Sequence, residues 1–194
     1  MAKPDPAAQK RERQKADRWV VTIFLVTIVI SGTISLLSDL IMSASSMFVA
    51  FLILLCIIFV GIIFDIIGMA VATADEKPFH SMAARKVAGA QESIRLLRNA
   101  ERVSSICNDV VGDICGVVSG SASATIAAQI LSSFDMTWPQ VVSLAMSALA
   151  AGLTVGGKAV GKSFAVESCT EIVFTVGKFL HSVQHLPDIF RKKK

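Results

Sequence analysis

Four polar side chains interrupt otherwise apolar stretches of the sequence, and their types suit one kind of chemistry. Asp65 lies in one such stretch, while Asn108, Asp109 and Asp113 lie in another. Carboxylate and amide oxygens are hard ligands, and Mg²⁺ keeps several waters while binding one or two carboxylates. Ionisable groups inside a membrane are candidates for function because they are costly there unless paired or hydrated. The sequence therefore predicts a site for a divalent cation, Mg²⁺ first, formed by Asp65, Asn108, Asp109 and Asp113.

The same side chains have a structural alternative. Asp109 and Asp113 are four residues apart and share one helix face, and Lys158 and Lys162 end a later apolar stretch. A carboxylate paired with either lysine would join two helices without binding a metal. Both interpretations stay open on the sequence alone. We expect no enzyme, because the sequence has no nucleophile motif, phosphate loop or nucleotide fingerprint.

Four apolar stretches are long enough to carry these residues across a bilayer. A helix needs about 20 mainly apolar residues to cross the hydrocarbon core. Only 18% of the 194 residues are charged, against about 25% in a typical soluble domain. Because the backbone must satisfy its own hydrogen bonds in lipid, we expect an all-α fold with four transmembrane helices. The predicted crossings run from Trp19 to Leu37, Met47 to Ala72, Val103 to Leu131 and Pro139 to Val160.

The basic residues indicate the orientation of these crossings. All 19 Lys and Arg residues lie in three segments that share the cytoplasmic side if both termini lie there, namely residues 1–18, 73–102 and 158–194. The opposite loops, 38–46 and 132–138, contain only the charges of Asp39 and Asp135. We therefore expect a multi-pass cell-membrane protein with cytoplasmic N- and C-termini and no nucleic-acid partner. A cleaved signal peptide is the alternative for the first stretch, although its apolar length exceeds the usual ~7–15 residues.

Two amphipathic segments complete the plan of the chain. Residues 80–99 mix cations with apolar residues and are expected to form helices on the membrane surface or under the bundle. Residues 163–186 are expected to form a juxtamembrane helix that precedes a basic tail. The plan is then a basic cytoplasmic N-terminus, two transmembrane helices, cytoplasmic amphipathic helices, two more transmembrane helices and the juxtamembrane segment, over residues 1–18, 19–72, 73–102, 103–160 and 161–194.

Small residues recur every four positions in the third predicted crossing. Gly112, Gly116, Gly120, Ala124 and Ala128 would line one helix face. In a membrane such a face lets another helix approach closely. We expect a homodimer through the face of Gly112, Gly116 and Gly120, although the same pattern fits a contact within one chain. The first two crossings are bulky and β-branched, which predicts that they lie more toward lipid.

From about Phe59 to His181 the order of features resembles the transmembrane module of the CorB/CorC and cyclin-M-like (CNNM) family. Residues 94–102 (IRLLRNAER) look like the family's leucine–glutamate–aspartate–proline–glutamate–arginine-like stretch before its second span. Residues 153–158 (LTVGGK) look like its Gly-Glu-Ile-Ile-Pro-Lys-like motif after the third span. The resemblance implies a protein that transports or senses magnesium or cobalt, with the first crossing of this chain as an addition.

The sequence departs from that family at its cation motif. The family's Ser-x-Ser-Glu-Thr motif would fall near residues 65–69, where every polar member is changed and Asp65 replaces the first Ser. Thr154 stands in place of the Glu after the third span, and the resemblance does not extend to the paired CBS domains that usually follow in the family. The alternative function is therefore a non-transporting membrane scaffold or partner-binding subunit that keeps the fold.

Overall fold

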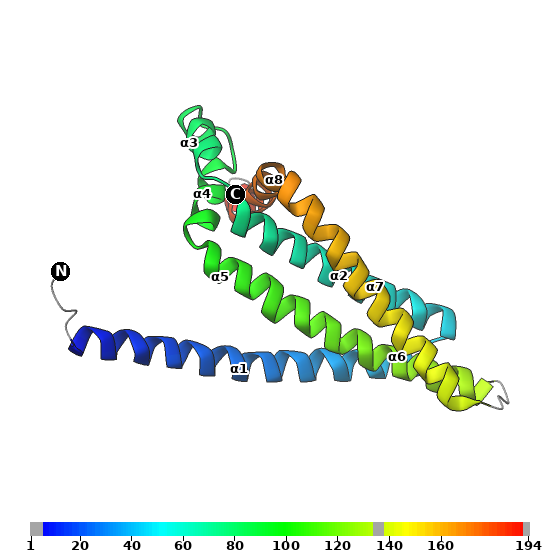
Figure 1. Cartoon of the computed structure of the whole chain (residues 1–194). Helices are drawn as coiled ribbons and strands as arrows, with labels where there is room; N and C mark the ends of the chain where they lie inside the picture. The colour runs from blue at the N-terminus through cyan, green and yellow to red at the C-terminus, as the bar shows by residue number, and fades with distance from the viewer. Residues whose placement is uncertain (1–5, 134–137, 192–194) are drawn as a thin grey trace.

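The computed structural model describes residues 6–133 and 138–191, and every regular element in this part of the chain is a helix (Figure 1). Four segments are long and apolar enough to cross a membrane, and they are Val20–Met42, Met47–Thr73, Ala100–Ser133 and Pro139–Glu167. The prediction of an all-α polytopic membrane protein is therefore confirmed. Asp135, which we expected in a loop, lies outside the described residues.

The helical segments in the described part of the chain form a simple series. In chain order they are α1 (Pro6–Ser43), α2 (Met47–Thr73), α3 (Lys77–Ala84), α4 (Ala90–Arg98), α5 (Ala100–Ser105), the π-helical segment η1 (Ile106–Gly112), α6 (Asp113–Ser133), α7 (Pro139–Glu167) and α8 (Cys169–Arg191). The third predicted crossing thus consists of α5, η1 and α6 in continuous succession.

Two of the long helices extend beyond their predicted ends. α1 continues to Ser43, so Asp39 lies inside a helix and not in a loop. α7 continues to Glu167, seven residues past its expected end. No proline or glycine-rich turn interrupts either extension, and each one adds a fully buried side chain to the core. These side chains are Met42 in α1 and Ala165 in α7. Because the next turn of each helix is buried, α1 and α7 both continue past the end of their predicted apolar stretch.

The positions of the first two crossings differ from each other. α1 lies at the periphery, and its most apolar window contains no buried residue. In Figure 1 the N-terminal half of α1 diverges from the other helices. In contrast, α2 packs against α5, η1, α6, α7 and α8, so the expectation that it lies toward lipid is wrong. Gly61 explains this central place, because a Cβ there would lie only 2.8 Å from Cys115 Cβ.

The short helices α3 and α4 gather with α8 at one end of the bundle, and these three helices form what we call the platform (Figure 1). Phe79, Leu97 and Val173 are buried where these helices meet α2 and α7. The opposite end, at the α6–α7 connection, is the turn end. A second core nearer the turn end contains Leu54 and Ile126. The bundle is therefore packed near both ends.

The contact between α4 and α8 depends on two glycines. Gly89 has a φ of +88°, a left-handed conformation that glycine adopts without a Cβ clash. A Cβ at Gly177 would lie 2.6 Å from the carbonyl oxygen of Gly89 and would also collide with the Ser93 hydroxyl. That hydroxyl donates hydrogen bonds to the Gly89 carbonyl at 2.9 Å and to the Val173 carbonyl at 3.2 Å. The amphipathic segment before α5 therefore forms two helices and a turn that hold α8 closely.

Candidate functional site

A buried ion pair joins α2 to α7. Asp65 Oδ1 lies 3.5 Å from Lys158 Nζ, and the side chains are 5% and 20% exposed respectively. Asp65 lies about 27 Å along α2 from Met47, and Lys158 lies about 28 Å along α7 from Pro139. Both groups therefore lie at the same level, toward the platform side of the apolar layer. A charged pair at this depth has an environment that is typical of functional sites in membrane proteins.

The backbone of η1 lies against this pair at Gly112. A Cβ at Gly112 would lie 3.2 Å from Lys158 Nζ and 3.6 Å from Asp65 Oδ1. Any larger residue would therefore crowd the ion pair. Gly112 belongs to the stripe of small residues that predicts helix contact, but it is buried within the protomer. The open part of that stripe begins at Gly116, where no atom lies within 4 Å of the position that a Cβ would take.

Asn108 enters the same layer from η1. Its side chain packs on Gly68 of α2, so closely that a Cβ at Gly68 would overlap the Asn108 amide oxygen. Asn108 Nδ2 donates a long hydrogen bond of 3.4 Å to Ser104 Oγ. Short π-helical segments occur often at functional sites, where they change the direction of side chains. Here the π segment brings an amide group to the buried face of α2.

Two buried acceptors in this layer lack a partner. Neither Asp65 Oδ2 nor Asn108 Oδ1 has a hydrogen-bond partner within the described residues. Asp65 faces Gly112, while Gly68, one turn further along α2, faces Asn108. The two oxygens therefore belong to the same α2–η1 contact, about one helical turn apart. Buried unpaired acceptors are unfavourable, and a water, a proton or a cation would satisfy them.

The other two predicted ligands lie elsewhere. Asp109 and Asp113 are exposed, and neither forms an ion pair with a described residue. Within residues 6–133 and 138–191 no group of three or more His, Cys, Asp or Glu side chains is arranged to hold a metal ion. The structure thus brings Asp65 and Asn108 together and leaves Asp109 and Asp113 on the surface. Lys158, which we considered as a partner for Asp109 or Asp113, pairs with Asp65.

Sequence reasoning identified Asp65 but not the two glycines that flank it on α2. Gly61, Asp65 and Gly68 are spaced three or four residues apart and lie on one helix face. All three are buried. A small–acidic–small pattern within an apolar helix is the signal that could have found them, because it allows a close backbone approach around one carboxylate.

A second polar cluster holds α1 near the turn end. Ser121 Oγ donates a hydrogen bond to Asp39 Oδ1 at 3.0 Å, and Thr125 Oγ1 donates another at 3.3 Å. One turn further, Gln129 Nε2 donates to the Met42 carbonyl at 2.8 Å. These contacts attach α1 to α6 at the end where the two helices converge. They give Asp39 a structural role in the α1–α6 contact.

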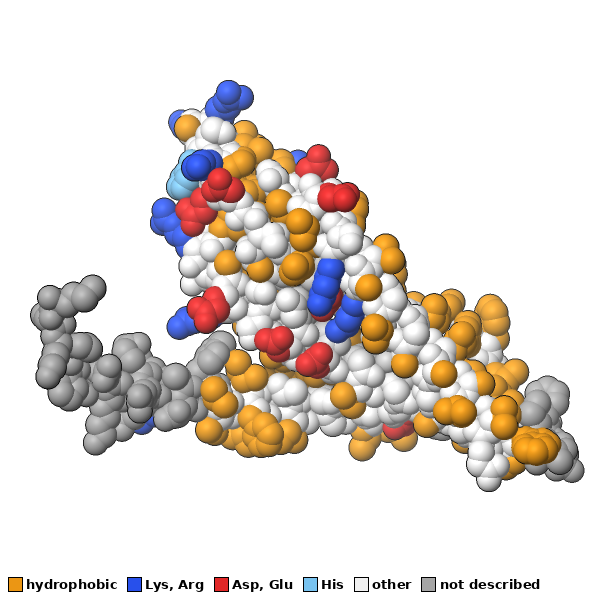
Figure 2. All heavy atoms as spheres, in the orientation of Figure 1, with side chains coloured by type: hydrophobic (Ala, Val, Ile, Leu, Met, Phe, Trp, Pro, Cys, Tyr) orange, Lys and Arg blue, Asp and Glu red, His pale blue; other side chains and the backbone are white. Residues whose placement is uncertain are grey.

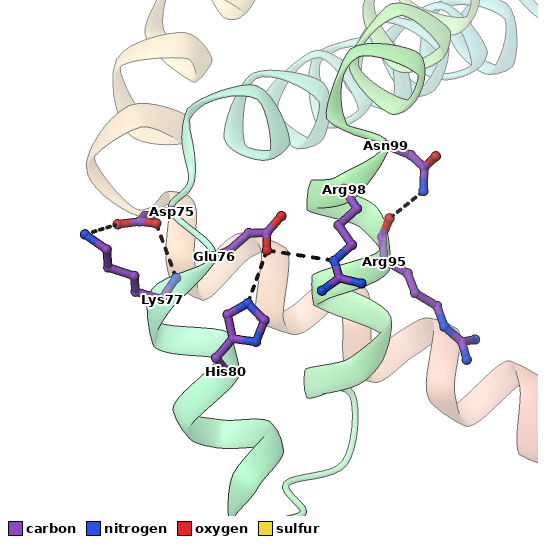
Figure 3. Close-up of polar contacts among 7 residues, drawn as sticks. All are labelled: Asp75, Glu76, Lys77, His80, Arg95, Arg98 and Asn99. Carbon is purple, nitrogen blue, oxygen red and sulfur yellow. Dashed lines mark hydrogen bonds and ion pairs between the residues drawn. The ribbon is translucent and has the colours of Figure 1, made fainter.

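The platform carries its own polar contacts (Figure 3). Glu76 Oε2 lies 3.2 Å from His80 Nε2 and 3.9 Å from Arg98 Nε, which connects α3 to α4. These side chains are largely exposed, so each pair contributes little stability. The less exposed pair is Glu92–His181, at 3.2 Å, which connects α4 to α8. Burial opposes ionisation of Glu92, but it is outweighed by hydrogen bonds from His181 and from the backbone N–H of Glu92, together with the charges of His181 and Arg95, so the pKa of Glu92 is lowered.

Comparisons with protein-family models, with curated proteins and with solved structures found no match to this chain. The fold and the site define the class of this chain as a four-crossing helical membrane protein with a buried polar layer.

Proposed function

We propose that this chain transports or senses a divalent cation, Mg²⁺ first, at the layer formed by Asp65 and Asn108. The observation that carries the proposal is the pair of buried, unpartnered oxygens, Asp65 Oδ2 and Asn108 Oδ1, at one helix contact. Mg²⁺ suits such a site because it retains several waters and needs only one or two carboxylates from the protein. The resemblance to the CorB/CorC transmembrane module supports the same class of substrate.

Lys158 has a defined role in this proposal. Its Nζ neutralises Asp65 while no other cation is bound. A divalent cation at Asp65 would repel Nζ, and the side chain, which is 20% exposed, would move away along its flexible stem. The layer would thus exchange one cation for another. This exchange avoids leaving a buried carboxylate without a counter-charge, which is strongly unfavourable.

The proposed orientation places the platform in the cytoplasm. The support comes from the distribution of Lys and Arg, all of which lie in segments that share the platform side in this arrangement. The Asp65–Lys158 layer would then lie near the cytoplasmic edge of the membrane. A cation would reach it from the cytoplasm through a short path.

The test is Mg²⁺ uptake and binding by the purified protein in liposomes. The wild type should show a Mg²⁺-dependent signal, and Asp65→Asn should remove it. Asp39→Asn is the matched control, since it makes the same chemical change at the turn end and should keep the signal. Asp113→Asn examines whether the site also needs an exposed carboxylate. A wild type without any metal-dependent signal in either measurement would exclude the proposal.

The alternative function, a non-transporting scaffold or partner-binding subunit, rests on a specific observation. Asp65 is already neutralised by Lys158, and the described residues contain no group of three metal-binding side chains. In this alternative the ion pair has a structural role alone, which is to hold α2 and α7 together. In that case the Asp65→Asn and Lys158→Met variants would change stability, and Mg²⁺ would have no effect on the wild type.

A further inference from the structure

α6 presents an open face that no other part of the described chain covers. Val117 is 62% exposed in the middle of this face, and Gly120 and Ala124 are exposed beside it. No atom lies within 4 Å of the position that a Cβ would take at Gly120. Asp113 is exposed on the same face, toward the platform. The α6 face thus consists of small residues with an acidic group at one end.

α7 presents a second open face of related composition. Ala148 and Gly152 are exposed, and no atom lies within 4 Å of a Cβ position at Gly152. Val155 is 67% exposed between them and the platform. Lys162 is exposed further along the same face and makes no ion pair in the described part of the chain. The α7 face therefore consists of small residues with a basic group at one end.

The two faces match in position along the membrane normal. α6 ends and α7 begins at the turn end, and their residues can be measured from there. Gly120 and Gly152 each lie about 20 Å from that end, and Ala124 and Ala148 each lie about 13 Å from it. Lys162 lies about 35 Å from it, between Asp113 at about 30 Å and Asp109 at about 36 Å. Small residues therefore meet small residues, and a lysine meets two carboxylates, when an α6 face is placed against an α7 face.

We propose that a second copy of this chain docks on this surface, with α6 of each copy against α7 of the other. A two-fold interface requires a surface that is complementary to itself. Figure 2 shows that acidic and basic side chains gather together on the face that α6 and α7 form. Lys162 of one copy then pairs with Asp109 and Asp113 of the other, and the contact occurs twice.

This arrangement differs from a dimer in which α6 meets α6. Both copies have the same orientation in the membrane, so an α6–α6 contact would bring the two Asp113 carboxylates together. Like charges at one level repel each other. The α6–α7 arrangement replaces that repulsion with attraction. It also uses the open glycines of both helices, which allow close packing in lipid.

The first test exchanges the charges. The fraction of dimer in detergent and in lipid is measured for the full chain by single-molecule photobleaching and size-exclusion chromatography. Lys162→Glu should weaken the dimer about tenfold or more, since it places like charges opposite each other. Combining it with Asp109→Lys and Asp113→Lys should restore the dimer, because the attraction returns with the signs reversed. A monomeric wild type, or a triple variant no better than Lys162→Glu, would overturn the proposal.

The second test determines which helices meet. The four native cysteines are replaced by alanine, and two differently tagged chains are co-expressed, one with Gly120→Cys and the other with Gly152→Cys. Oxidation should link the two tags. Val160→Cys is the control on α7, where an exposed residue outside the proposed face should not react with Gly120→Cys. Links between two Gly120→Cys chains without links to Gly152→Cys would replace the proposal with an α6–α6 dimer. These measurements do not depend on Mg²⁺, so their outcome is independent of the tests of the proposed function.

Discussion

The Asp65–Lys158 pair allows a quantitative test of the buried layer. Two unit charges 3.5 Å apart attract each other by about 5 kcal/mol at an effective dielectric constant of about 20. The loss of hydration on burial offsets much of this attraction, so the intact pair adds little net stability. Removing one partner is different, because it leaves a charge in the apolar layer, and it costs about 3–5 kcal/mol.

The structure also predicts which single variant is worse. Asp65 is 5% exposed, whereas Lys158 is 20% exposed on a long side chain. In Asp65→Asn the lysine can turn toward water, so we expect a loss near the lower end of this range, about 3 kcal/mol. In Lys158→Met the carboxylate stays buried, so we expect a loss of about 4–5 kcal/mol. The double variant should lie within about 2 kcal/mol of the wild type, since no unpaired charge remains.

The assay is a double-mutant cycle on the free energy of unfolding. Unfolding in detergent micelles is induced by titration with a denaturing detergent and is monitored by circular dichroism. Lys86→Met serves as the control, because it removes an exposed lysine of the α3–α4 turn that has no ion pair in the described chain and should change stability by less than about 0.5 kcal/mol. Strictly additive losses in the double variant would show that the two groups do not interact, and the reasoning about the layer would fail.

Two further predictions concern the platform and the orientation. The lowered pKa of Glu92 means that its contact with His181 stabilises the platform above the ordinary pKa of 4.5, and that this stability disappears as the pH falls through the lowered value. The thermal midpoints of the wild type and Glu92→Gln should therefore differ near neutral pH and converge in acid; a constant difference would contradict this assignment. In intact cells of a cysteine-free background, Ala44→Cys should react with an impermeant thiol reagent, while Ser81→Cys should react only after the membrane is opened. The reverse pattern would refute the proposed orientation.

The sequence was sufficient for the number and approximate place of the membrane-crossing helices. Long stretches without charge are defined by local composition, and lipid selects them whatever their neighbours are. Helix ends were less predictable. The ends of α1 and α7 depend on burial of Met42 and Ala165 against other helices, which no local pattern contains. The central place of α2 was missed for the same reason, because Gly61 and Gly68 are important only in allowing other helices to approach α2 closely.

Polar residues at membrane depth were also visible in the sequence, but their pairing was not. The spacing of Asp109 and Asp113 places them on one regular helix face, and it made them candidates for the same layer as Asp65. The π-helical segment η1 changes the number of residues per turn in this region, so faces before and after it fall out of register. The packing of this crossing against α2 then decides which side chains are enclosed: Asn108 packs on Gly68, while Asp109 and Asp113 are exposed.

Local chemistry therefore determined which residues of this protein lie in the membrane and which of them are unusual there. Only the tertiary structure decided that Lys158 meets Asp65, that Gly112 is enclosed, and that the small-residue faces of α6 and α7 stay open. The physical reason is that partition into lipid depends on each segment alone, whereas an ion pair depends on the rotation and height of two separate helices.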